Sequence, residues 1–249
     1  MNAYDKFKAE CVEEIAAQGA DGTLKELSSA WFDRSHAMKY SYHFEWMGRP
    51  IIQYPQDLLA MQELIWNIKP DLILETGIAH GGSLIFSASM LELNALCGGP
   101  SNASVLGIDI NIREHNRAAI EAHPMARRIL MIQGSSISPE VVTEVVSKAK
   151  DKKKVLVCLD SNHTYQHVLA ELQAYAPLVS LGSYCVVFDT VVEDMPTEMF
   201  SDRPWRPGNS PKTAVMEYLQ THPEFSIDRG IDDKLLLSVA PSGYLKRVA

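Results

Sequence analysis

Hydrophobic residues follow two patterns along this chain of 249 residues, short continuous runs and helical spacing. From residue 71 onward, short and nearly unbroken apolar runs alternate with stretches in which apolar residues recur every three or four positions. The runs are typical of strands covered on both faces, and the periodic stretches of amphipathic helices. The expected strands are 71–75, 105–110, 129–133, 155–160 and 184–189, and the expected helices are 83–96, 113–122, 139–150 and 164–179. The pattern predicts a parallel, Rossmann-like α/β sheet with helices on both faces.

The residues before this alternation have a helical pattern instead. Apolar spacing predicts one helix over 4–19, a second that begins after Asp21 as its N-cap, and a third from Pro55 that ends before Lys69. Between the second and third helices, residues 40–55 are rich in aromatic side chains and have no clean period. Such a stretch suits either a packed connector or a lid over a ligand.

The end of the chain also departs from the alternation. A proline-rich loop and a helix over 212–221 precede three short expected strands, at 225–228, 235–240 and 244–248. Because Pro241-Ser-Gly243 is a tight turn, the last two strands are expected to pair as an antiparallel hairpin. We therefore expect an N-terminal helical segment over 1–54 and an α/β domain over 55–249.

Composition narrows the class of protein. A hydrophobic content of 46% describes a globular chain with a sizeable core. The net charge of −8 argues against a nucleic-acid or anionic-membrane binder, because both need a basic surface. The four cysteines are widely spaced, and Cys158 and Cys185 fall in apolar runs typical of buried free thiols. No apolar run approaches about 20 residues and the first residues are not those of a secretory signal, so a cytoplasmic protein is expected.

A glycine-rich turn, Glu75-Thr-Gly-Ile-Ala-His-Gly-Gly82, follows the first strand of the expected sheet. Gly77 and Gly81 let the backbone bend sharply, and the amides of a helix that begins near Ser83 would face a ligand. A dinucleotide site has G-x-G-x-x-G, whereas the acid before this turn suits a positively charged ligand. The turn resembles motif I of class I S-adenosylmethionine (SAM) methyltransferases. The alternative is an ordinary glycine turn in another α/β protein.

The ends of the next two strands are polar as well. Ligands in such sheets bind beyond the carboxyl ends of the strands. The second strand ends in Asp109-Ile110, where a carboxylate would accept both ribose hydroxyls unless it is only a helix cap or a surface acid. The third ends in Gln133-Gly-Ser135-Ser, a polar turn that suits an adenine edge but is also a common loop.

The fourth and fifth strands each end in an aspartate, Asp160 and Asp189. Because these strands are expected to be neighbours, the two carboxylates would meet and could hold Mg²⁺, Mn²⁺ or Ca²⁺. Such a cation would lower the pKa of a substrate hydroxyl. The alternative is that both acids only cap helices or balance charge.

Two histidines follow on the same rim. His163, three residues after Asp160, suits a base for a hydroxyl proton, and His167 lies one helical turn later. A purely structural role is the alternative for both, and His80 is assigned no role. Asp160, His163 and His167 also match the ligand set of a non-haem iron oxygenase. An iron oxygenase, however, would leave the glycine turn and Asp109 unexplained. A hydrolase is not favoured either, because the sequence has no G-x-S-x-G or H-E-x-x-H motif.

Five stretches within residues 40–195 resemble the cephalosporin hydroxylase-like family. Despite its name, that family is similar to SAM-dependent O-methyltransferases, including rhamnosyl and macrocin-type sugar O-methyltransferases. The stretches are Trp46-Met-Gly-Arg-Pro-Ile-Ile-Gln-Tyr-Pro-Gln-Asp57, Leu74-Glu-Thr-Gly-Ile-Ala-His-Gly-Gly-Ser83, Val105-Leu-Gly-Ile-Asp109, Asp160-Ser-Asn-His-Thr164 and Val187-Phe-Asp-Thr190. The Gly-Arg-Pro-Ile-Ile-Gln and Asp-Ser-x-His pieces are the most particular of these.

The resemblance implies roles for individual residues. It implies that Asp160 and Asp189 ligate the metal, with His163 as the base. The residues expected to bind SAM are Glu75, Gly77, Gly81, Ser83, Asp109, Ile110, Gln133, Ser135 and Asp160. Characterised family members can carry Glu-Asp where this chain has Phe188-Asp189, so one carboxylate is lost unless Glu193 or Asp194 compensates. Oligomers formed through the N-terminal region are also implied.

The sequence therefore predicts a SAM-dependent O-methyltransferase, assisted by Mg²⁺ or another divalent cation, that acts on a hydroxyl of a small molecule such as a sugar. The side chains expected to border the acceptor are Arg49, Gln53, Tyr54, Arg203, Trp205 and Arg206. Trp46 and Trp205 equally suit core or interface positions. The alternatives are the iron oxygenase and a SAM-binding module without catalysis. The sequence does not identify the acceptor.

Overall fold

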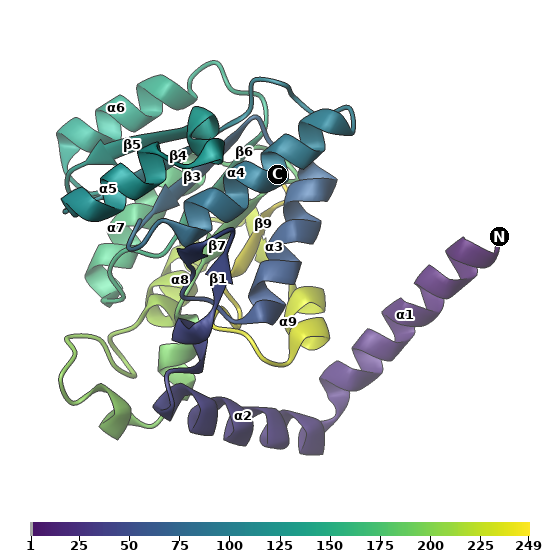
Figure 1. The fold of residues 1–249 in the computed structure, drawn as a ribbon. Coiled ribbons are helices and arrows are strands. Elements are labelled where there is room, and N and C mark those ends of the chain that lie inside the picture. The colour runs from purple at the N-terminus through teal and green to yellow at the C-terminus, as the bar shows by residue number, and fades with distance from the viewer. Residues whose placement is uncertain (1) are drawn as a thin grey trace.

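The computed structural model describes residues 2–249, whose centre is a seven-stranded sheet of order β5-β4-β3-β6-β7-β9-β8 (Figure 1). The first five strands in this order are parallel, and β9 is antiparallel to both of its neighbours. The strands are β3 (Leu72–Thr76), β4 (Ser104–Asp109), β5 (Ile129–Gln133), β6 (Val155–Leu159), β7 (Tyr184–Val187), β8 (Phe225–Ile227) and β9 (Tyr244–Arg247). All five apolar runs predicted as parallel strands are confirmed.

Alternate residues of the central strands supply two hydrophobic cores, one on each face of the sheet. Leu72 and Leu74 lie in one core, whereas Ile73 between them lies in the other. Helices α3 (Pro55–Ile68), α4 (Gly82–Leu96) and α5 (Glu114–Glu121) cover the Ile73 face. Helices α6 (Pro139–Ala149), α7 (Tyr165–Tyr175) and α8 (Pro211–Thr221) cover the other. Because both faces are covered, the strands had to be apolar throughout.

Short 3₁₀ helices connect several of these elements. They are η2 (Pro124–Arg128), η3 (Ala176–Leu178), η4 (Thr190–Asp194) and η5 (Thr197–Phe200). Cys158 and Cys185 are buried free thiols, as predicted. Within residues 2–249, no helix has both the length and the apolar character needed to cross a bilayer.

The predicted strand over 235–240 is wrong. Helix α9 (Arg229–Leu235) enters this range, and the residues after it form no strand. The buried carboxylate of Asp57 on α3 accepts hydrogen bonds from Ser238 Oγ (2.6 Å), Val239 N (2.9 Å) and Tyr244 OH (2.8 Å). Because the amide of Val239 donates to Asp57, it is not available for the hydrogen bonds of a strand. The antiparallel end of the sheet was predicted correctly, but β9 pairs with β7 and β8 instead.

The N-terminal helices α1 (Ala3–Ala20) and α2 (Gly22–Ala37) form an arm beside the sheet (Figure 1). Asp21 caps α2, as predicted, because its Oδ1 accepts from Leu24 N at 3.0 Å. The arm contacts the body where Gln18 Nε2 donates to the Asp233 carbonyl oxygen of α9 at 2.7 Å. The aromatic stretch that follows forms η1 (Tyr40–His43), β1 (Glu45–Trp46) and β2 (Arg49–Pro50).

Candidate active site

The carboxyl ends of the parallel strands meet at one edge of the sheet, around the turn that follows β3. Gly77 N donates to the Ile108 carbonyl oxygen of β4 at 2.8 Å, and Asp160 N donates to the Thr76 carbonyl oxygen at 3.0 Å. The glycine turn therefore lies between the ends of β4 and β6. In an open α/β sheet, this edge is where ligands bind.

Gly77 of the glycine turn packs against Asp160, the residue that directly follows β6. Its φ of +87° lies in the left-handed region, and a Cβ placed on it would overlap the Asp160 carbonyl oxygen. Both the backbone conformation and the lack of space therefore require glycine at this position. The turn and the end of β6 consequently pack as one unit.

Replacing Gly77 by alanine is expected to lower the free energy of unfolding by about 2 kcal/mol or more, because steric overlap adds to backbone strain. Gly98→Ala is the matched control, since Gly98 has a φ of +80° but nothing within 4 Å of an added Cβ. Strain alone should reduce its stability by about 1 kcal/mol. Urea unfolding measures both variants, and equal losses would contradict the packing argument.

Asp109 holds the glycine turn in this structure. Its Oδ2 accepts from Ile78 N (2.9 Å) and Ala79 N (3.3 Å), and its Oδ1 accepts from Asn111 N (2.9 Å). The carboxylate is partly exposed at the ligand edge. Its ribose role stays a prediction, and the described contacts add a structural role that the sequence did not indicate.

The other residues expected to bind SAM also lie at the carboxyl edge or next to it. Gly81 is the N-cap of α4, with Ser83 in the first turn of that helix. Ile110 and Gln133 are exposed, whereas Ser135 is partly buried in the turn after β5. The structure therefore brings this set to one side of the sheet, and their contacts with SAM remain predictions.

Glu75 is a buried carboxyl group at the end of β3. Burial raises its pKa to about 7, and the hydrogen bond that Ser83 Oγ donates to Oε1 opposes that rise. A cavity of about 50 Å³ lies next to this strand end, lined by residues that include Gln53, Gly77, Ser83 and Asp160. A positively charged group bound here would favour the ionised form of Glu75.

The raised pKa predicts a pH-dependent stability without ligand. Because the pKa of Glu75 rises from 4.5 to about 7 on folding, its contribution to stability is complete below pH 4.5. As the pH rises through about 7, that contribution falls by about 3 kcal/mol. Glu75→Gln should therefore match the wild type near pH 4.5 and exceed its free energy of unfolding at pH 8. A difference between the two proteins that is the same at both pH values would contradict this.

Asp160, His163 and Asp189 form the one group within residues 2–249 that has the geometry of a metal site. One ligand atom from each lies within 4.8 Å of the others, and His163 Nε2 is 3.1 Å from Asp189 Oδ2. Burial, followed by the negative charges of Asp189 and Glu75, raises the pKa of Asp160 well above its usual value. A bound cation would relieve this repulsion between carboxylates.

Two side chains from other segments reach this cluster. Gln53 Nε2 donates to Asp160 Oδ2 at 3.2 Å, and Gln53 Oε1 is buried without a partner among the described residues. The orphaned oxygen would be satisfied by a ligand N–H or by a cation. The ring of Trp205 packs edge-on against His163, with centroids 4.8 Å apart, and Arg203 lies 5.4 Å from that indole. These contacts place two of the expected acceptor-side residues, Gln53 and Trp205, at the cluster, with Arg203 beside Trp205.

The sequence did not indicate His36 of α2. Burial lowers its pKa, and the negative charges of Asp189 and Asp33 oppose that shift. Phe32, on the same helix, stacks on Tyr54 at a centroid distance of 4.7 Å. The arm therefore packs against Tyr54, the neighbour of Gln53, and no local pattern in one sequence could have revealed this.

Several residues expected near the acceptor have other partners. Arg49 Nε donates to the His80 carbonyl oxygen at 3.0 Å, which holds the glycine turn. Tyr54 is fully buried and shares a hydrogen bond with Ser35 at 3.0 Å. Arg206 pairs with Asn209 in an isolated bridge. The described side-chain contacts of Arg49 and Tyr54 are structural, whereas the bridge of Arg206 is made by its backbone and does not involve its side chain.

The lost carboxylate at Phe188 is not replaced by the expected neighbours. Phe188 is buried in the core, Glu193 accepts from Ser210 Oγ at 2.5 Å, and Asp194 binds Lys212 at 2.6 Å. The third side chain of the cluster is His163, which offers an imidazole nitrogen and not a carboxylate. His167 is not in the cluster either, so the two-histidine set of an iron oxygenase is not assembled.

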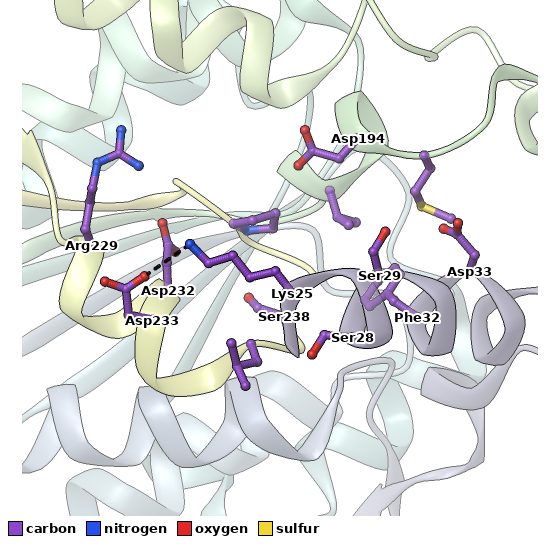
Figure 2. A pocket seen from close by; sticks show the side chains of 14 residues that line it. Lys25, Ser28, Ser29, Phe32, Asp33, Asp194, Arg229, Asp232, Asp233 and Ser238 are labelled. Atoms are coloured by element: carbon purple, nitrogen blue, oxygen red, sulfur yellow. Dashed lines mark ion pairs between the residues drawn. The ribbon is translucent and has the colours of Figure 1, made fainter. Parts of the chain in front are cut away.

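A larger cavity of about 310 Å³ lies between α2, η4 and α9 (Figure 2). Lys25 and Phe32 line it from α2, and Asp232 lines it from α9. Neither Asp160 nor His163 is among its lining residues. Although this cavity has the larger volume, the residues expected to carry the chemistry do not line it.

The antiparallel β9 between β7 and β8 separates this sheet from that of a Rossmann dehydrogenase, in which the strands continue parallel. The acid-flanked glycine turn that follows β3 completes the arrangement expected of a SAM methyltransferase. The chain belongs to the rhamnosyl O-methyltransferase/CmcI family, whose model matches residues 38–248. The family and enzyme class expected from the sequence are confirmed.

Individual relatives agree with this assignment. The chain is 29% identical over 205 residues to a rhamnosyl O-methyltransferase of Mycobacterium leprae, covering 81% of this chain and 82% of that protein. It is 29% identical over 208 residues to one of Mycobacterium tuberculosis, covering 81% and 77%. An apo structure of CmcI shares the fold, with a TM-score of 0.56, 19% identity, and coverage of 84% and 77%. A CmcI structure with Mg and SAM has a TM-score of 0.54, 17% identity, and coverage of 84% and 78%.

Proposed function

We propose that the protein methylates a hydroxyl of a sugar in a glycoside, with a divalent cation held by Asp160 and Asp189 and with His163 as the base. The observation that carries this proposal is the Asp160–His163–Asp189 cluster at the ends of adjacent strands, within 4.8 Å. The rhamnosyl O-methyltransferases among its relatives support a sugar as the acceptor.

The donor set fits a hard cation. Carboxylate oxygens suit Mg²⁺ or Mn²⁺, whereas an imidazole nitrogen is a poor ligand for Mg²⁺. With Mg²⁺, His163 is therefore left free to accept a proton. A cation bound by the two aspartates supplies Lewis acidity that lowers the pKa of the acceptor hydroxyl.

His163 Nε2 lies 3.1 Å from Asp189 Oδ2 and donates its hydrogen to that carboxylate, so the ring takes the hydroxyl proton at Nδ1. Asp189 orients the imidazole, and the indole of Trp205 shields one edge of the ring from water. The acceptor oxygen then bonds to the methyl carbon of SAM as the carbon–sulfur bond breaks, which leaves S-adenosylhomocysteine. Gln53 keeps the Asp160 carboxylate directed toward the cluster.

Release of S-adenosylhomocysteine tests this function. A panel of rhamnosides, other glycosides and catechols is incubated with SAM, with Mg²⁺ or with EDTA. Release is expected from a glycoside and should fall strongly with EDTA. Absence of release from every acceptor, with no SAM binding by calorimetry, would contradict methyl transfer. Release that EDTA leaves unchanged would contradict only the role of the cation.

We also propose that residues 1–54 act as a lid and an oligomer contact. Pro50, Ile51 and Gln53 line the same cavity as Gly77 and Asp160, which supports the lid. Large exposed apolar side chains of the arm support the contact, namely Tyr4, Phe7, Val12, Leu27 and Met38.

The oligomer contact predicts a change of mass in solution. The full chain should be larger than a monomer by light scattering, and the double variant Phe7→Glu/Val12→Glu should be monomeric, because two charges would be buried at the contact. A monomeric wild type would contradict the contact.

A further inference from the structure

Three polar residues of α7 recur at four-residue spacing and share one face of that helix. They are His167, Glu171 and Tyr175. None of them belongs to the Asp160–His163–Asp189 cluster. Instead, this face contacts the turn after β5, where SAM binding is expected, and the residue that follows Asp160.

The imidazole of His167 joins these two places. Its Nε2 lies 3.0 Å from Ser136 Oγ in the turn after β5 and 3.1 Å from Ser161 Oγ. Ser161 Oγ donates to Glu171 Oε1 at 2.6 Å, and Tyr175 OH donates to the Ser136 carbonyl oxygen. Four contacts from one helical face therefore hold the two turns together.

The hydrogen-bond partners of His167 indicate which of its ring nitrogens carries a proton. Ser161 uses its own hydrogen toward Glu171, so its lone pairs face His167 Nε2. Glu171 Oε1 lies 3.4 Å from the same nitrogen and can only accept when ionised. His167 therefore donates from Nε2 at the centre of the group.

Glu171 is an unfavourable residue for packing alone. It is fully buried, and its Oε2 has no hydrogen-bond partner within residues 2–249. A buried polar atom without a partner destabilises a fold, and an apolar side chain of similar volume would suit the core better. Its role is instead to fix the orientation of the Ser161 hydroxyl and the His167 imidazole, both of which face its Oε1.

We propose that His167 and Glu171 are positioning residues that hold the Ser135–Ser136 turn against the end of β6, so that SAM meets a preformed site. The proposal rests on the proposed function, because it takes this turn as part of the SAM site. α7 begins at Tyr165, two residues after His163. The helix that contacts the SAM-side turn therefore directly follows the loop that carries the base.

Calorimetry with S-adenosylhomocysteine on the full chain tests the proposal. His167→Ala removes two contacts and should weaken binding about 10-fold. His167→Gln keeps an N–H donor and should remain within about 3-fold of the wild type. In kinetics, the KM for SAM should rise with His167→Ala while the KM for the acceptor stays unchanged. His115→Ala, on the exposed face of α5, is the control and should bind like the wild type.

The outcomes separate this proposal from the proposed function. Wild-type binding that His167→Ala leaves unchanged overturns the positioning role alone. A wild type that does not bind S-adenosylhomocysteine overturns the proposed function, and this inference with it. If His167→Ala does not fold, Ser136→Ala removes only the contact on the turn and should still weaken binding, and wild-type affinity in that variant overturns the role.

Discussion

Replacing Asp160 by asparagine is expected to lower kcat/KM for methyl transfer by about 1000-fold or more. The variant keeps the size of the side chain and an acceptor for Gln53 Nε2, but it removes one of two carboxylates from the cluster. Binding of the cation and activation of the hydroxyl should both fail. The measurement is release of S-adenosylhomocysteine over a Mg²⁺ titration.

The Asp160→Asn substitution should not lower the stability of the folded protein. Burial and the charges of Asp189 and Glu75 raise the pKa of Asp160, so a neutral amide is at least as favourable there as the ionised acid. Its free energy of unfolding without ligand should equal or exceed that of the wild type. Asp151→Asn, on an exposed turn, is the matched control and should retain full activity. Activity of Asp160→Asn within about 10-fold of the wild type at saturating Mg²⁺ would contradict a metal role.

Replacing His163 by alanine is expected to lower kcat by about 10²- to 10⁴-fold, the usual contribution of a general base. The KM for SAM should change little, because the imidazole contacts Asp189 and Trp205 at the acceptor side. The residual rate should rise with pH, since solvent must then take the proton. Steady-state kinetics across pH measures both effects.

The control for this change is another histidine-to-alanine substitution, His115→Ala, on the exposed face of α5. It should leave kcat unchanged. A His163→Ala enzyme that keeps more than about a tenth of kcat would show that the cation alone activates the hydroxyl. The base would then have to be assigned elsewhere.

The site has two halves that the glycine turn joins. Asp109 and Glu75 border the half expected to bind SAM, and Asp160 belongs to the half expected to carry the chemistry. Gly77 packs directly on the backbone of Asp160. A shift of the turn would therefore move the reacting groups as well, which is why Gly77→Ala should affect more than stability.

The sequence by itself determined the elements and the edge at which the site forms. Apolar runs and helical periods are local patterns, so the five parallel strands were predicted with their order along the chain. The carboxyl ends of parallel strands gather at one edge, so Glu75, Asp109, Asp160 and Asp189 were expected to lie together. The approach of His163 to Asp189 also follows from its position just after β6.

Tertiary structure alone decided the partners of individual side chains. Residues 235–240 have a strand-like apolar run, yet Asp57, far away in the sequence, binds Ser238 and Val239 and prevents a strand there. His167 shares the spacing of a metal ligand, but the turn after β5 supplies Ser136 as its partner. These contacts join segments distant in the chain and depend on the direction of each side chain, which local periodicity does not specify.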